Sequence, residues 1–303
     1  MLKFSIFADL HHYPGVFMGG TYEDLDLIRT RAVESGCSFV IHAGDLTHGP
    51  SLCPDYMAAV DAFPLPVYHC LGNHDTDGTS LEETLRAYHM PDGHYFFDEG
   101  GYRFLVLDPN YCLLDGEYIH FDLGNYFAHG EARDWMPPDQ LEWLRESIRT
   151  APGPCVLISH ESFERPDGVK NRDEVQKILR EANARRPHSV ILCINGHYHR
   201  DFMRILDGIC YWDLNSASYD WVGEKHGLYP EDLCREYSLL SNTLVYNDPV
   251  HAVVTLEGTT ITIEGMESSM FLGWNREHTT NPVYDPAGRP VTPRVLSAKI
   301  TLG

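Results

Sequence analysis

The chain lacks the paired cysteines that disulfides and zinc–thiolate sites require. Its eight cysteines are scattered over 303 residues, and no Cys-x-x-Cys pair occurs. Several stand inside apolar stretches such as Cys155-Val-Leu-Ile158, where a thiol packs as a small hydrophobic group. We therefore expect free thiols and, with them, a reducing cytoplasmic setting.

Long hydrophobic runs are also missing. The first apolar stretch, residues 2–8, ends at the polar Asp9 and is too short for the hydrophobic part of a signal peptide. No other run approaches the length of a membrane span, so we expect no membrane contact. Because no linker rich in Gly, Ser or Pro interrupts the chain, we predict one domain over residues 1–303.

Positive charge is scarce. The 23 basic and 44 acidic side chains give a formal net charge of −21. Sequence-independent binding of nucleic acid needs a basic surface that displaces counterions from the phosphates, so we expect no nucleic-acid polymer as partner. A small anionic substrate stays compatible with this balance if bound metal ions make the active site locally positive.

Short apolar runs alternate with helical patterns over roughly the first two hundred residues, which is typical of βαβ units and a layered α/β architecture. The pattern predicts a helix capped by Thr21 and ended by Gly36. Further expected elements are strands at 37–43, 66–70, 154–159 and 189–194, helices at 54–62, from 138 onward and at 172–185, and a hairpin at 94–108.

Two segments interrupt this regular pattern. Residues 109–137 are predicted to be a long, aromatic-rich connection, and 216–248 are aromatic and irregular, a candidate insertion or lid. For the aromatic residues of 216–248, packing or an oligomer contact is favoured over stacking on a substrate. A homo-oligomer is thus one open possibility. The last third of the chain is expected to turn toward β structure, with hairpins at 204–213 and 251–265, and 251–303 is expected to be a β-rich C-terminal part.

Polar segments follow directly after several of the expected strands. Open α/β sheets place their ligand sites at such carboxyl ends. The segments contain two Asp, one Asn and four His that are suitable as metal ligands, which fits two adjacent metal ions. They are Asp9-Leu10-His11, Gly44-Asp45, Gly72-Asn73-His74-Asp75, Ser159-His160 and Gly196-His197-Tyr198-His199.

This ordered set resembles the pattern of the calcineurin-like metallophosphoesterase superfamily: D-x-H, G-D, G-N-H-D/E, H and G-H-x-H. The resemblance spans residues 9–199. It implies an α/β fold in which a four-layer sandwich is built from two packed mixed β-sheets flanked by helices. Within the superfamily, the blocks are similar to those of class III cyclic-nucleotide phosphodiesterases and of manganese-dependent ADP-ribose/CDP-alcohol diphosphatases.

The resemblance also implies a role for each residue. Asp9, His11 and His199 are expected to bind one metal ion, Asn73, His160 and His197 the other, and Asp45 to bridge the two. The oxygen and nitrogen ligands suit manganese, iron, zinc or nickel. His74 is expected to donate a hydrogen bond or a proton to the substrate, with Asp75 orienting its imidazole.

The implied reaction is the hydrolysis of a small-molecule phosphodiester or pyrophosphate, through in-line attack by a hydroxide that bridges the metal ions. A phosphomonoesterase shares this metal core and is one alternative. A binding protein that has lost catalysis on the same fold is another. The second alternative predicts missing ligands, whereas this sequence keeps all of them.

Other histidines near the motifs have competing interpretations. His42 and His69 lie inside strands and are expected to pack in the core or to support the ligands by contact, without binding a metal ion themselves. For His12 and His48, a position in the site and a purely structural role stay open. If the backbone is extended at His197-Tyr-His199, the alternation of a strand places both imidazoles on one side.

Overall fold

The computed structural model describes residues 1–280, 282–283 and 291–303. It contains two six-stranded mixed sheets, ordered β16-β15-β14-β1-β2-β3 and β10-β11-β9-β8-β5-β4. The first is formed by Leu2–Phe7 (β1), Val40–Ala43 (β2), Val67–Cys70 (β3), Ala252–Glu257 (β14), Thr260–Gly265 (β15) and Ala298–Thr301 (β16). The second is formed by Tyr95–Glu99 (β4), Tyr102–Val106 (β5), Cys155–Ile158 (β8), Val190–Asn195 (β9), Phe202–Leu206 (β10) and Ile209–Asp213 (β11).

The two sheets pack face to face over the largest cluster of buried side chains. Side chains alternate along each strand, so Phe4 and Ile6 of β1 point into this cluster while Phe7 points to the opposite face. Phe104 and Trp212 contribute from the second sheet. The shared core fixes the two sheets against each other.

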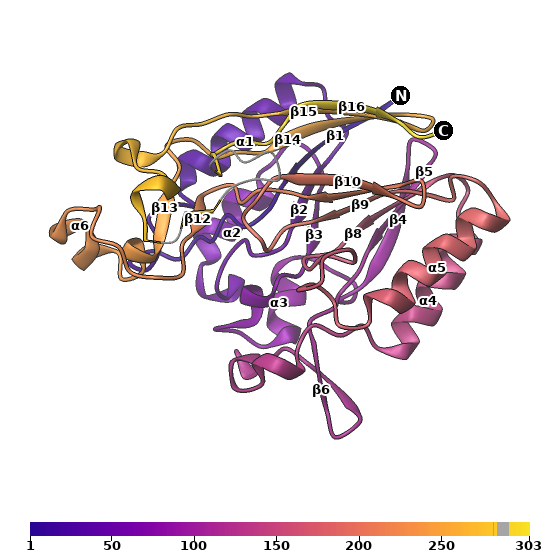
Figure 1. Ribbon diagram of the computed structural model, residues 1–303, viewed down its shortest axis with the longest axis horizontal. Helices are drawn as coiled ribbons and strands as arrows, with labels where there is room; N and C mark the ends of the chain where they lie inside the picture. The colour runs from indigo at the N-terminus through magenta and orange to yellow at the C-terminus, as the bar shows by residue number, and fades with distance from the viewer. Residues whose placement is uncertain (281, 284–290) are drawn as a thin grey trace.

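Helices cover the outer face of each sheet (Figure 1). Tyr22–Glu34 (α1) and Pro54–Asp61 (α2) pack on the first sheet through buried residues such as Ile28 and Val60. Pro138–Arg149 (α4) and Arg172–Arg185 (α5) pack on the second sheet through Leu144 and Leu179. The four-layer sandwich of two mixed sheets flanked by helices is therefore confirmed.

Local sequence signals account for the helix boundaries. Thr21 caps α1, since its side chain accepts from the backbone N–H of Asp24 while the Asp24 carboxylate accepts from the N–H of Thr21. Gly36 follows the helix with a left-handed φ of 69°. Pro138 occupies the first turn of α4, where a missing N–H costs nothing.

Residues 109–137 contain more structure than the predicted connection. They form a hairpin, Tyr111–Leu114 (β6) and Glu117–His120 (β7), followed by 3-10 turns at Asn125–Ala128 and Gly130–Ala132. The signal was Asp115-Gly116, both with positive φ, which is the turn chemistry of a two-residue hairpin. The hairpin projects from the sandwich in Figure 1.

Residues 216–248 form the short antiparallel pair Tyr219–Trp221 (β12) and Thr243–Val245 (β13) and the helix Glu231–Glu236 (α6). Tyr219 and Tyr229 are buried in a cluster with Phe17, as the packing interpretation predicts. Trp221 differs, because 42% of it is exposed. A lid role for the segment stays a prediction.

The final residues join the first sheet, because β14 pairs antiparallel with β1 and extends the sheet through β15 and β16. A β-rich part after residue 251 is therefore found among the described residues. Leu81–Ala87 (α3) completes the helices of the described chain. All eight cysteines are free thiols, as expected. Among the described residues, no helix combines the length and apolar character that crossing a membrane requires.

Candidate metal centre

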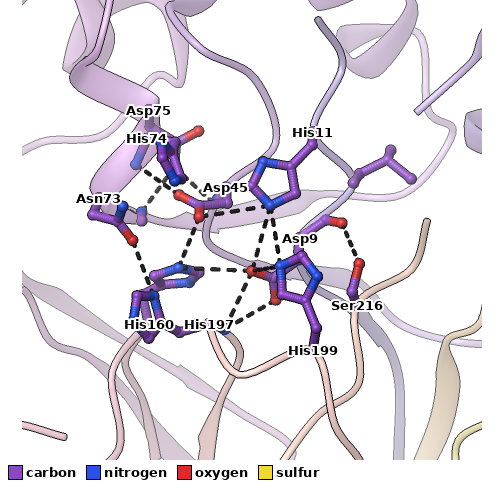
Figure 2. Close-up of polar contacts among 12 residues, drawn as sticks. Asp9, His11, Asp45, Asn73, His74, Asp75, His160, His197, His199 and Ser216 are labelled. Carbon is purple, nitrogen blue, oxygen red and sulfur yellow. Dashed lines mark hydrogen bonds and ion pairs between the residues drawn. The ribbon is translucent and has the colours of Figure 1, made fainter. Parts of the chain in front are cut away.

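The predicted site residues come together where parallel strands of the two sheets end. Asp9 follows β1, Asp45 follows β2, and the 3-10 turn Asn73–Thr76 follows β3. From the second sheet, His160 follows β8 and His197 follows β9. Figure 2 shows these side chains converging, with Asp45 central among them.

The first group consists of Asp9, His11 and His199, all buried. Nε2 of His199 lies 3.3 Å from Asp9 Oδ1 and 3.3 Å from Nε2 of His11. The opposite ring nitrogen of His199, Nδ1, donates to the Tyr219 carbonyl at 2.8 Å. Because Nδ1 carries the proton of the neutral ring, Nε2 keeps its lone pair. This lone pair faces the side of Asp9, where a metal ion could bind both residues.

The second group consists of Asp45, His160 and His197. His160 donates from Nδ1 to the Ala43 carbonyl at 2.9 Å, which directs its Nε2 toward Asp45 Oδ2 at 3.0 Å. Asn73 Oδ1 lies 3.0 Å from Nδ1 of His197, so an amide oxygen reaches the same group. Carboxylate, imidazole and amide-oxygen atoms of this kind could hold a second cation.

Asp45 faces both groups. Its Oδ2 lies 3.0 Å from His160 Nε2 in the second group and 3.8 Å from His11 Nε2 in the first. The same carboxylate accepts from the backbone N–H of His74 through Oδ1, at 2.8 Å. A carboxylate held in this way between two sets of imidazoles is a candidate for a ligand shared by two cations.

The residues present fit a pair of cations. Nε2 of His160 is buried without a hydrogen bond, although it lies beside Asp45. Burial lowers the pKa of His11 and of His197 well below the usual range, which keeps both imidazoles neutral and able to bind a metal ion. Burial opposes the charge of His160 as well, yet Asp45 and Asp9 raise its pKa well above the usual range. The buried carboxylates therefore require positive charge at this point.

The backbone at the ligands is left-handed. Asp9, His11 and Asp45 have φ of 53°, 52° and 59°, and His197 and His199 have φ of 71° and 51°. The extended conformation considered for His197-Tyr-His199 is therefore wrong, and the two imidazoles enter different groups. Non-glycine residues in this region cost about 1–3 kcal/mol each and are concentrated at functional sites.

Two glycines of the motifs, Gly44 and Gly72, allow the candidate ligands Asp45 and His160 to pack closely against the backbone. A Cβ atom on Gly72 would lie 2.2 Å from Asp45 Oδ1, and one on Gly44 would lie 2.1 Å from the His160 ring. Neither distance is compatible with a side chain. The glycines before Asp45 and Asn73 are thus required by the packing of the ligands themselves.

Asp75 does not orient His74, contrary to the prediction. Its fully buried carboxylate accepts from the backbone N–H groups of Gly72, Asp45, Leu46 and Thr47 at 2.8–3.3 Å, and from the Tyr88 hydroxyl at 2.6 Å. The 3-10 turn Asn73–Thr76 buries the Asp75 side chain and leaves that of His74 partly exposed. Asp75 therefore holds the Asp45 loop against the Asn73 loop.

Asp77, which lies outside the predicted motifs, contacts His74 instead. Its Oδ2 accepts from His74 Nδ1 at 2.7 Å and from His48 Nδ1 at 2.9 Å, while its Oδ1 accepts from the Tyr126 hydroxyl at 2.8 Å. Nε2 of His48 lies 3.1 Å from Nδ1 of His11. The sequence contains one indication of this contact, since Asp77 follows His74 by three residues in the same loop.

Three further histidines that lie near the motifs make contacts outside the two groups of candidate ligands. His42 and His69 form a buried pair with 3.2 Å between their Nδ1 atoms, as expected for core residues. The His12 ring stacks on Tyr56 at 3.7 Å, and its Nδ1 lies 2.7 Å from the Gly20 carbonyl oxygen. Of the two histidines with open interpretations, His48 therefore lies beside the candidate centre, and His12 packs outside it.

Comparison with known proteins gives a family and a fold. A model of the calcineurin-like phosphoesterase family matches residues 2–201. A dimetal phosphatase from Danio rerio is similar in structure, with a TM-score of 0.65, 16% identity, and coverage of 100% of this chain and 99% of that chain. GAP50, the anchor in the inner membrane complex of Plasmodium, has a TM-score of 0.57 and 13% identity over 100% and 89% of the two chains. Both likenesses concern the fold, and a comparison with curated proteins finds no match.

Proposed function

Because the chain belongs to the calcineurin-like phosphoesterase family, and is thereby a metal-dependent phosphoesterase, we propose that it hydrolyses a phosphodiester or pyrophosphate bond of a small molecule. The observation that carries the proposal is the position of Asp45 between the imidazoles of two groups of candidate ligands, in which every member except the half-buried His197 is buried. The acidic net charge of −21 supports a small molecule over a nucleic-acid polymer as the substrate.

We assign Asp9, His11 and His199 to one metal ion, Asn73, His160 and His197 to the other, and Asp45 to both. The oxygen and imidazole ligands suit manganese, iron, zinc or nickel. When bound, the two cations supply a water molecule of lowered pKa and neutralise negative charge on the phosphoryl group.

The chain itself supplies the proton chemistry. The His74 side chain is 30% exposed, whereas all the assigned ligands except the half-buried His197 are buried. With its Nδ1–H held by Asp77, its Nε2 is available to the phosphoryl oxygen or to the leaving group. We propose His74 as the general acid and Asp77, in place of Asp75, as the residue that positions it.

The free cysteines support the cytoplasm as the proposed compartment, because reducing conditions keep thiols unpaired. No observation favours the alternative of a binding protein that has lost catalysis. That alternative predicts missing ligands, whereas every predicted ligand lies in the two groups described above.

The test is hydrolysis of an aryl phosphodiester and an aryl phosphomonoester by manganese-reconstituted protein, alongside Asp45→Asn and His74→Ala. We expect the diester to be the better substrate, Asp45→Asn to lose both bound manganese and turnover, and His74→Ala to retain manganese while turnover falls at least a hundredfold. Preferred monoester cleavage would replace the diester proposal with a phosphatase. Unchanged hydrolysis in both variants would refute the site.

A further inference from the structure

Three side chains beside the candidate centre form a further cluster of metal-binding atoms, separate from the two groups of assigned ligands. One ligand atom from each of His48, His74 and Asp77 lies within 4.8 Å of the other two. Asp77 Oδ2 is 2.7 Å from Nδ1 of His74 and 2.9 Å from Nδ1 of His48. We call His48, His74 and Asp77 the third group.

The third group has the composition of a zinc site with an open position. Two imidazole nitrogens and one carboxylate oxygen are ligands of zinc, and a fourth position is commonly left to water. Around a tetrahedral zinc ion, ligand atoms at about 2.0–2.2 Å from the metal lie roughly 3.3 Å from one another. The two contacts of Asp77 therefore need to lengthen by only about half an ångström to admit such an ion.

The carboxylate of this group is held in place, and the group is accessible to solvent. The second oxygen of Asp77, Oδ1, accepts from the Tyr126 hydroxyl at 2.8 Å, which fixes the direction of Oδ2. The side chains of His48 and Asp77 are only 6% and 15% exposed, whereas that of His74 is 30% exposed. A cation can thus reach the group from solvent on the side of His74 and meet two ligands that are already positioned.

We propose that His48, His74 and Asp77 bind a third cation of the zinc type, and that this ion inhibits hydrolysis when zinc is in excess. The binding site stands on the geometry of the three side chains. The inhibition rests on the proposed function, because it acts through His74 and through the assigned ligand His11.

Zinc is favoured over manganese at the third group, because imidazole nitrogen binds zinc more strongly in the order of the divalent metals. An occupied first group repels a further cation, since the His11 ring centroid lies only 5.3 Å from that of His48. We therefore expect the third ion to bind more weakly than the two ions of the centre. Inhibition then requires zinc beyond the amount that fills the centre.

A cation at the third group removes the proton chemistry of His74. Its Nδ1 then gives a lone pair to the metal ion, so the ring can no longer carry protons on both nitrogens. A neutral ring that loses its remaining proton from Nε2 becomes an imidazolate, which makes it a far poorer proton donor than an imidazolium. The leaving group thereby loses its general acid.

His48 transmits the same change to the first group. Its Nε2 lies 3.1 Å from Nδ1 of His11. With a metal ion on Nδ1, the neutral His48 ring keeps its proton on Nε2, so Nδ1 of His11 has to accept that hydrogen bond. The His11 proton then lies on Nε2, the atom assigned to the first metal ion. Occupation of the third group therefore weakens one ligand of the centre.

The test measures how many metal ions the protein binds. Manganese-loaded protein is dialysed against excess zinc, and the total metal bound per chain is determined by elemental analysis. Hydrolysis of an aryl phosphodiester is followed in the same samples. We expect three ions per chain, and a rate at least roughly tenfold below the rate before zinc is added.

His48→Gln removes one ligand of the third group and none of the ligands assigned to the centre. This variant should bind two ions per chain. Zinc should lower its rate at least roughly tenfold less than it lowers the rate of the wild type, because the general acid stays free of metal. Any exchange of manganese for zinc in the centre affects both proteins alike, so the comparison isolates the third ion.

His89→Gln is the matched control, because His89 also contacts a carboxylate, that of Asp61 at 3.1 Å, and lies outside the third group. It should bind three ions and be inhibited like the wild type. Two ions in the wild type, three in His48→Gln, or a third ion that leaves hydrolysis unchanged would overturn the inference. The proposed function fails separately, through hydrolysis that survives Asp45→Asn, and circular dichroism confirms that His48→Gln is folded.

Discussion

Asp77 and His74 form the shortest side-chain hydrogen bond around the candidate general acid, with 2.7 Å between Oδ2 and Nδ1. The same oxygen accepts from His48, which in turn lies beside the first-group residue His11. If His48 donates to Asp77, its Nε2 is an acceptor, so His11 donates from Nδ1 and keeps the Nε2 lone pair for a metal ion. One carboxylate thereby sets the tautomers of two functional imidazoles.

Replacing Asp77 by asparagine should lower kcat by about 10- to 100-fold with little change in KM, because a neutral amide orients the imidazoles less firmly than a carboxylate. Steady-state kinetics with an aryl phosphodiester at saturating manganese measure this effect. Tyr126→Phe, which removes only the hydroxyl at 2.8 Å from Asp77 Oδ1, should cost a smaller factor in kcat. A change confined to KM would contradict the positioning role.

Asp75 should behave differently when it is replaced by asparagine. The amide nitrogen that Asp75→Asn introduces would face backbone N–H groups that now donate to a carboxylate, so we expect the free energy of unfolding to fall by about 2–4 kcal/mol. Urea denaturation measures the loss. The exposed Asp55, in the first turn of α2, provides the control, and Asp55→Asn should stay within about 0.5 kcal/mol. Equal stability of the two variants would show that the Asp75 bonds are not important to the fold.

The difference between Asp75 and Asp77 shows what the sequence can and cannot reveal. The strands, most helices and the converging ligands were predictable, because hydrophobic periodicity and strand ends are local properties. The 3-10 turn Asn73–Thr76 decides which carboxylate contacts His74. A turn of four residues is too short for the hydrophobic pattern of the sequence to predict its geometry. The left-handed backbone at Asp9 and His199 was likewise hidden, since tertiary packing imposes it.

Gly72→Ala should disrupt the metal centre without any backbone strain. Gly72 has a φ of −97°, which alanine adopts freely, so the cost arises from the Cβ atom 2.2 Å from Asp45 Oδ1. We expect the affinity for manganese to fall at least tenfold, as measured by calorimetry. Gly130→Ala is the control, because a Cβ atom there has no neighbour within 4 Å. Unchanged manganese affinity in Gly72→Ala would argue against Asp45 as a ligand.

The buried pair His42 and His69 should make the fold sensitive to acid. Burial, with a further contribution from His89, lowers the pKa of His69 to about 3. In the unfolded chain the pKa of a histidine is about 6.5, so below that pH the unfolded state binds a proton that folded His69 does not. The free energy of unfolding should therefore fall by about 1.4 kcal/mol for each pH unit from 6.5 toward 3 on account of this residue.

Urea denaturation at pH 7, 6, 5 and 4 measures this slope in the wild type and in His69→Gln. In the wild type, 3.2 Å separates the Nδ1 atoms of His69 and His42. Glutamine places a polar group there that does not titrate, so the variant should lose stability less steeply with falling pH. The two curves should converge toward acid pH, since the wild type loses the larger amount. Parallel curves over this range would mean that His69 becomes protonated in the folded protein, and that burial does not exclude the charge.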